Sequence, residues 1–206
     1  FRDAAFEKFE RLGFPTSKLE NYKYTDMSAP LSMEYGLNIN RLQFQINPYD
    51  VFKCDVPAIH SYLFFVLNGT FYPVNSTAKQ HLPEGVIIES LRTAADNYPQ
   101  LVEKYLGKLS NEKNDGWIAF NETFAQDGFF MYVPKNVKLS KPVQLINIMR
   151  SDVDFMANSH NLIILEEGAK AQLLVCDHTM DNVHFFSNRL TEVFAGKNAV
   201  YEHYKL

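Results

Sequence analysis

The sequence predicts an α+β domain over residues 1–126, followed by a strand-rich domain over residues 127–206. Helical spacing of apolar residues, near the N-terminus and again between residues 91 and 124, indicates helices in the first domain. The dipeptide Asn68-Gly69 between two apolar runs indicates a β-hairpin. After Asp127-Gly128, short β-prone runs alternate with turn residues, which is typical of packed strands.

The first predicted helix ends at Gly13, which suits the backbone conformation that closes a helix. Its apolar positions follow helical spacing at Ala5, Phe6, Phe9 and Leu12. Ser17 and Glu20 have the spacing of a capping box, so we expect a short second helix to begin there. Tyr22 and Tyr24 are expected to pack that helix onto the rest of the domain.

The middle of the chain mixes strand and helix signals. The alternation of Leu42, Phe44 and Ile46 predicts one strand. Residues 62–67 and 70–74 are the predicted hairpin strands, and residues 86–88 follow a Pro-Gly turn as a further strand.

Three helices are then predicted before residue 126. Leu91, Ala94, Ala95 and Tyr98 share one helical face. Pro99 suits the first position of the next helix, because proline lacks the N–H that a helix start leaves unpaired. The third helix carries Trp117, Phe120 and Phe124 on its apolar face.

The second predicted domain begins with strands separated by prolines. The predicted strands are residues 129–133, 137–139 and 143–149, and Pro134 and Pro142 interrupt them because proline cannot donate to a ladder. Further on, Glu167-Gly168-Ala-Lys-Ala171 is echoed by Ala195-Gly196-Lys-Asn-Ala199, an offset of 196 − 168 = 28 residues. The echo favours stacked coils of a solenoid, with Ala171 and Ala199 in equivalent positions. A jelly roll or a sandwich would use the same strands and turns.

Composition excludes several classes of function. The chain has 206 residues and a net charge of −4, so it lacks the basic footprint of a nucleic-acid-binding domain. No apolar run approaches the roughly 20 residues of a membrane span. Cys54 and Cys176 form no disulfide framework, which fits a reducing, cytoplasmic compartment. A chain that starts at Phe1 leaves open a removed signal peptide.

The sequence contains no catalytic signature, so we predict no catalytic residue. The most suggestive ligand set is Cys176, His178 and His184, because residues two apart on a strand share a face. Two ligands do not make a site, so we predict that Cys176 and His178 bind no metal. His160 and His203 are expected to be solvent-facing or hydrogen-bonded.

Acidic residues suggest an alternative, a carbohydrate-active β-helix enzyme. The carboxylates concerned are Asp152, Asp154, Asp177 and Asp181. Paired carboxylates can perform acid–base chemistry or hold calcium. Acids are also common where a chain turns, and no basic groove for a polysaccharide accompanies them.

The stretch FNETFAQDGFFMYVPKNVKLSKP (Phe120–Pro142) resembles the SufB/SufD family of iron–sulfur cluster assembly proteins. It resembles the family phrase LN-x-AF-x-x-DG-x-x-x-x-VP-x-x-V-x-L-x-x-P, with Phe120 at the leucine position and Thr123 at the alanine position. Three further segments resemble the family in the same order: LGFPTSKLENYKYTD (Leu12–Asp26), NLIILEEGAKAQLL (Asn161–Leu174) and TEVFAGKNAVYEHYKL (Thr191–Leu206). Tyr22 stands where tryptophan is common, and Asn161 where arginine is common. The Leu12–Asp26 phrase is closer to the SufD branch.

This resemblance implies a right-handed parallel β-helix, of which residues 127–206 are the first coils. It also implies a non-enzymatic scaffold that works with SufB and the ATPase SufC. The family handles iron–sulfur clusters transiently, and we expect no cofactor to be bound by this chain. The resemblance also implies that the SufB–SufD pairing surface and the cluster-ligand histidine lie in later coils, and that a C-terminal helical segment contacts SufC. Both are expected beyond Leu206, so no ligand residue is assigned here. The alternatives are the carbohydrate-active enzyme or a structural fragment without its own activity.

The last strand suggests one more expectation. Residues 199–206 are β-prone, with Tyr201 and His203 on one side and Val200, Glu202 and Tyr204 on the other. Neither side carries enough charge to repel another chain, and an unpaired strand edge recruits one. We therefore expect the chain to self-associate through its C-terminal strands.

Overall fold

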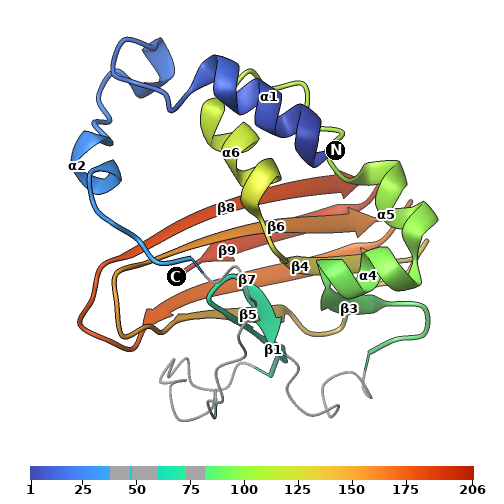
Figure 1. Ribbon diagram of the computed structural model, residues 1–206. Coiled ribbons are helices and arrows are strands. Elements are labelled where there is room, and N and C mark those ends of the chain that lie inside the picture. Colours follow the sequence, from blue (N-terminus) through green and yellow to red (C-terminus); the bar gives the residue numbers. More distant parts are fainter. Residues whose placement is uncertain (38–46, 48–59, 73–81) are drawn as a thin grey trace.

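The computed structural model describes residues 1–37, 47, 60–72 and 82–206, shown as coloured ribbon in Figure 1. The predicted strand at Leu42–Ile46 and the residue Cys54 lie outside these ranges.

The strands form two sheets, with helices on the outer face of one of them (Figure 1). The first sheet has the order β3 (Ile87–Ser90), β4 (Phe129–Val133), β6 (Phe155–Leu165) and β8 (Phe185–Ala195). The second has the order β2 (Thr70–Tyr72), β1 (Tyr62–Leu67), β5 (Val143–Met149), β7 (Lys170–Thr179) and β9 (Val200–Lys205). We call them the helix-covered sheet and the second sheet.

From β4 to β9 the chain alternates between the two sheets. Neighbouring strands in this region pair in parallel, including β6 with β8 and β7 with β9. The predicted parallel pairing is confirmed for the region 162–175, where β6 pairs with β4 and β7 with β5. The hairpin β1–β2 and the pair β3–β4 are antiparallel, so both sheets are mixed. The predicted strand at residues 137–139 is reduced to an isolated bridge between Lys138 and Lys170.

The predicted equivalence of Ala171 with Ala199 is wrong, because Ala171 pairs with Tyr201. The ladder sets Lys170 opposite Val200, an offset of 30 residues. The two glycines of the echo therefore have different roles. Gly168 occupies a corner with φ 69°, and the matching corner has Asn198 at φ 58°. Gly196 instead passes close to the neighbouring strand's turn, where a Cβ would lie 2.7 Å from the Glu167 nitrogen.

The main core lies between the two sheets. Alternate residues of each strand point into it, as expected for strands with one face buried against another sheet. The second sheet contributes Val143, Leu145 and Leu173, and the helix-covered sheet contributes Met131, Ile163 and Leu165. All are at most 2% exposed.

The helices are α1 (Arg2–Leu12), α4 (Leu91–Asn97), α5 (Pro99–Tyr105) and α6 (Gly116–Phe124), with a short α2 (Ser28–Leu31). Pro99 begins α5 as predicted. Helix α1 lies against α6 (Figure 1), where Phe9 and Phe120 rings are 5.2 Å apart. This contact requires glycine at position 116, because a Cβ there would lie 1.8 Å from the Gly13 carbonyl oxygen.

The predicted helix beginning at Ser17 is only a 3₁₀ turn over Glu20–Tyr22, and no side chain caps it. Tyr22, the last residue of this turn, holds the turn on the domain, because its hydroxyl donates to Asp115 Oδ2 at 2.6 Å. Tyr24 is 93% exposed, so its predicted packing role is wrong. Short segments lose helicity easily, because helix nucleation is costly.

The hairpin between β1 and β2 turns at the predicted dipeptide. Asn68 has φ 49° and Gly69 has φ 80°, the two positive values that a type I′ turn requires. The Asn68 side chain is buried and paired with one residue, since its Nδ2 donates to the Arg150 oxygen at 2.7 Å and its Oδ1 accepts from the Arg150 nitrogen at 2.9 Å. The turn is therefore tied to the loop that follows β5.

Candidate functional site

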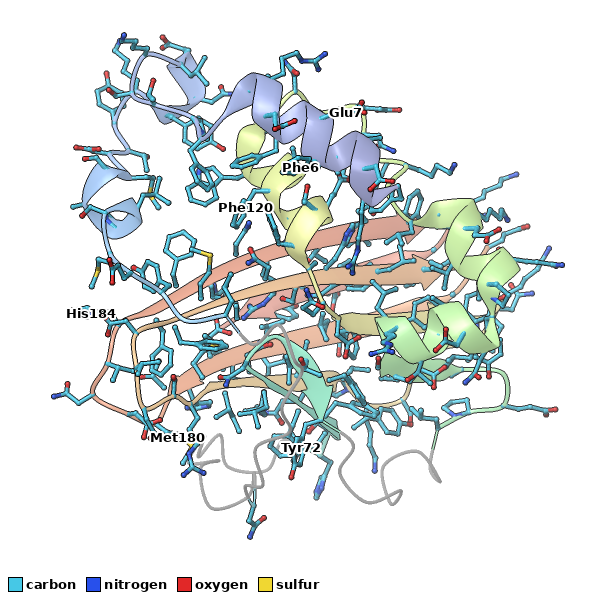
Figure 2. The ribbon with its side chains drawn as sticks, in the orientation of Figure 1. Phe6, Glu7, Tyr72, Phe120, Met180 and His184 are labelled. Atoms are coloured by element: carbon cyan, nitrogen blue, oxygen red, sulfur yellow. The ribbon has the colours of Figure 1, made fainter. Side chains whose placement is uncertain are left out.

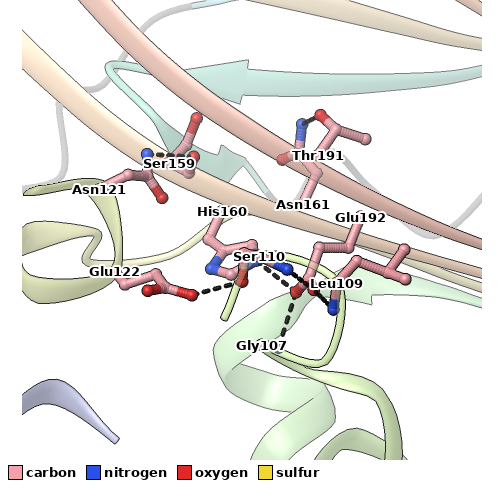
Figure 3. Close-up of polar contacts among 10 residues, drawn as sticks. All are labelled: Gly107, Leu109, Ser110, Asn121, Glu122, Ser159, His160, Asn161, Thr191 and Glu192. Carbon is pink, nitrogen blue, oxygen red and sulfur yellow. Dashed lines mark hydrogen bonds and ion pairs between the residues drawn. The ribbon is translucent and has the colours of Figure 1, made fainter. Parts of the chain in front are cut away.

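A buried polar cluster lies between the helix-covered sheet and the loop that joins α5 to α6 (Figure 3). His160 on β6 and Glu192 on the neighbouring strand β8 point outward from this sheet. The His160 Nε2 atom lies 2.8 Å from the Glu192 Oε2 atom, and the two side chains are 4% and 2% exposed. Burial of a carboxylate is costly unless it is paired and hydrogen-bonded.

Glu192 meets that requirement with three backbone donors. The Gly107 nitrogen donates to Oε2 at 2.7 Å, and the Leu109 and Ser110 nitrogens donate to Oε1 at 2.8 and 3.1 Å. One carboxylate therefore holds the α5–α6 loop on the sheet, as Figure 3 shows.

The pKa of Glu192 reflects this environment. Burial alone raises the pKa, but the hydrogen bonds from His160 and from the Gly107 and Leu109 nitrogens outweigh it. Together these effects lower the pKa of Glu192 below the ordinary value of a glutamate, so the charged form is favoured.

Helix α6 adds two polar side chains to the cluster. Asn121 donates through Nδ2 to the oxygens of Ser159 and Asn188, at 3.0 and 2.9 Å, which fixes α6 across β6 and β8. The Ser110 hydroxyl donates to Oε1 of Glu122, a residue only 2% exposed. The Glu122 Oε2 atom is buried and finds no hydrogen-bond partner among the described residues.

The Asp127-Gly128 dipeptide of the family-like stretch joins three segments. Asp127 Oδ2 accepts from the Phe71 nitrogen at 3.0 Å, while Oδ1 accepts from the Ser90 hydroxyl at 2.7 Å and the Arg92 nitrogen at 3.1 Å. Gly128 passes so close to β6 that a Cβ would lie 1.8 Å from the His160 carbonyl oxygen. Both residue types are thus required by packing around β6, the hairpin and the start of α4.

Cys176 and His178 lie two residues apart on β7, opposite Ile146 and Ile148 of β5, but the structure does not group His184 with them. Cys176 is buried in a cluster with Phe65, Ile146 and Ile148 on the second sheet's outer face. His184 lies in the loop before β8 (Figure 2), where its backbone nitrogen and Nδ1 contact Asp154 at 2.9 and 3.2 Å. Within the described part of the chain, no group of three or more His, Cys, Asp or Glu residues is arranged to hold a metal ion.

Three of the acids considered for an enzyme, Asp154, Asp177 and Asp181, have separate structural contacts. Asp177 pairs with Arg189 at 2.9 Å and Lys205 at 3.2 Å, and these cations outweigh the effect of burial to lower its pKa. Asp181 accepts from the Ser151 nitrogen at 3.0 Å, and Asp152 is exposed. His203 contacts the Tyr201 hydroxyl, and burial, followed by Arg189 and Lys205, lowers the pKa of His203.

Sequence reasoning missed Glu192, Glu122 and Asn121. Their partners are 12 to 85 residues away along the chain, so no local spacing reveals them. The only available signal was an acid, Glu192, in an otherwise β-prone run.

Comparisons with known proteins point to one family over most of the chain. Residues 1–145 match the family described as the SufBD protein N-terminal region. An iron–sulfur cluster assembly SufBD family protein from Synechocystis is 33% identical over 129 residues, covering 61% of this chain and 26% of that protein. SufD from Bacillus subtilis is 31% identical over 130 residues, covering 62% of this chain and 30% of SufD.

A third relative extends the match. A SufBD family protein from Porphyra purpurea is 26% identical over 189 residues, covering 84% of this chain and 38% of the relative. The matched part of this chain therefore spans well under half the length of these relatives. No helix among the described residues is long and apolar enough to cross a membrane.

Proposed function

Because the chain belongs to the SufBD family, we propose that it is the N-terminal part of a SufD-like scaffold for iron–sulfur cluster assembly. The match over residues 1–145 is the observation that carries this proposal. The SufD relative from Bacillus subtilis supports the choice of branch. The proposed partners are a SufB-like protein and a SufC-like ATPase, bound through regions that are expected mostly beyond Leu206.

The proposed architecture is the start of a right-handed parallel β-helix. It is supported by the alternation of β4–β9 between two sheets and by parallel neighbours 30 residues apart in β6–β8 and β7–β9. In such a fold each coil packs against the previous one. The N-terminal domain, which precedes the first coil, would therefore determine where the stack of coils begins.

We propose a non-enzymatic role for the chain in the cytoplasm. The acids that suggested a carbohydrate enzyme have other roles: Asp177 pairs with a cation, Asp181 accepts from a backbone nitrogen, and Asp152 is exposed. This favours a scaffold over a carbohydrate-active enzyme. The chain is proposed to bind no metal of its own. Elemental analysis of protein purified without chelator tests this, and stoichiometric iron or zinc that disappears in Cys176→Ser would contradict it.

The function is tested by co-expressing the natural protein that contains this region with the SufB-like and SufC-like proteins of its source. A co-eluting complex that accumulates an iron–sulfur chromophore under anaerobic iron and sulfide supply is expected. Asp127→Ala should reduce recovery of the complex through misfolding, whereas the exposed Asp96→Ala should not. A well-folded protein that joins neither partner would contradict the proposal.

A further inference from the structure

An apolar pocket of about 230 Å³ lies against the first half of β6 and shares no lining residue with the buried polar cluster. Residues 155–158 of β6 form one side of it. The hairpin between β1 and β2 forms a second side, and the end of α6 forms a third. Leu37 also lines the pocket and is 47% exposed, so it forms the rim where the pocket meets solvent.

Hydrogen bonds between neighbouring segments hold the sides of this pocket in place. The segment before Leu37 is fixed on β6, because Gly36 and Phe155 form a parallel bridge. The hairpin is fixed by the Asn68 side chain, which is bound to the Arg150 backbone. Helix α6 is fixed across β6 and β8. The pocket is therefore formed without a ligand, which reduces the entropy that binding would cost.

The pocket is lined mainly by apolar side chains. They include the rings of Phe124 and Phe155 and the thioether of Met156, a flexible and polarisable group. None of the described residues that line the pocket is ionisable. A charged ligand would lose its hydration there without gaining an ion pair, which is costly. The lining therefore favours a neutral, apolar ligand.

The size and the lining together narrow the class of ligand. An apolar cavity of about 150 Å³ is enough to bind benzene, and the pocket described here is larger, at about 230 Å³. Aromatic rings pack favourably edge to face or offset against other rings, and thioether sulfur packs favourably against ring edges.

We propose that this pocket binds a small neutral aromatic molecule of one or two fused rings. The molecule enters past Leu37, and its ring contacts Phe124 and Met156. The inference is independent of the scaffold function, because it rests only on the pocket and its lining.

NMR of the methionine methyl groups in the 206-residue chain tests the proposal. The probe is indole, and indole-3-carboxylate is its charged match. Indole should shift the Met156 methyl signal, which is identified by its loss in Met156→Leu. The Met131 methyl signal should stay unchanged, because that side chain is buried between the two sheets. Indole-3-carboxylate should bind at least about tenfold more weakly, because no cation in the lining pairs with its carboxylate.

Three variants locate the binding site. Phe124→Ala should weaken indole binding about tenfold, because it removes a ring contact. Leu37→Ala should weaken it severalfold without affecting the fold, since Leu37 is an exposed rim residue. Leu19→Ala changes a similarly exposed leucine outside the pocket and should bind indole like the parent chain. Circular dichroism checks that each variant is folded.

Several results would overturn the proposal. One is a Met156 methyl signal that stays unchanged up to the solubility limit of indole. Another is equal affinity for indole in the parent chain, Phe124→Ala and Leu37→Ala, which would place the indole elsewhere. Equal affinity for indole and indole-3-carboxylate would show that the ring is not enclosed by the apolar lining.

Discussion

The His160 imidazole and the Glu192 carboxylate form a 2.8 Å contact between two adjacent strands, and neither side chain is more than 4% exposed. Glu192 also accepts from the backbone of residues 107, 109 and 110. A single acid therefore connects β6, β8 and the α5–α6 loop, and its removal leaves several buried donors without an acceptor.

Glu192→Ala should lower the free energy of unfolding by about 3–5 kcal/mol, the usual cost of breaking a buried ion pair. Urea denaturation followed by circular dichroism measures this. The exposed Glu112→Ala is the control and should stay within about 0.5 kcal/mol of the parent chain. Equal midpoints for the two variants would show that the cluster contributes little.

The same residue predicts a pH dependence. The folded pKa of Glu192 lies below its unfolded value, so its contribution to stability is complete above the unfolded pKa of about 4.3. The contribution is lost as the pH falls through the folded pKa. The stability gap between the parent chain and Glu192→Gln should therefore narrow below about pH 4. A gap that stays constant from neutral to acidic pH would contradict this assignment.

Asp127→Asn should destabilise the chain by about 1–3 kcal/mol, because one oxygen that accepts a backbone N–H becomes an amide donor facing it. Chemical denaturation measures the loss. Asp96→Asn on the exposed face of α4 is the matched control and should have no measurable effect. If both variants unfold at the same denaturant concentration, Asp127 does not join the hairpin to α4 in solution.

The turn at Asn68-Gly69 makes a separate prediction. Gly69→Val should destabilise by roughly 1–3 kcal/mol, because valine resists the positive φ of 80°. Gly69→Asn should lose less, since asparagine tolerates that conformation. Thermal unfolding of the two variants gives the comparison, and an unchanged midpoint for Gly69→Val would show a different turn in solution.

Self-association is expected through the edge strands. In the sheets formed by the described residues, β8 and β9 are edges. Light scattering at several concentrations should show oligomers of the 206-residue chain. Lysine on an edge strand discourages pairing, so Val200→Lys with Tyr204→Lys should shift the chain toward monomer. A parent chain that is monomeric at every concentration would rule the prediction out.

Local patterns predicted much of the fold, because they report on local constraints. Pro99 marked the start of α5, and Asn68-Gly69 marked the hairpin turn. The glycine echo misplaced the repeat by two residues, since a glycine needed for positive φ at 168 was matched to one needed for close packing at 196. No comparable local constraint marks the cluster around Glu192, which forms only when distant segments meet.

The double hydrogen bond between Asn68 and Arg150 also affects the chemical ageing of the protein. In a flexible Asn-Gly pair, the glycine nitrogen attacks the asparagine side chain and releases ammonia. Here both polar atoms of the side chain are held by the Arg150 backbone, and the residue is buried. The side-chain carbon therefore cannot rotate toward the Gly69 nitrogen while the hairpin is folded. Deamidation at Asn68 therefore requires local opening of the hairpin. Its rate reports how often the hairpin opens.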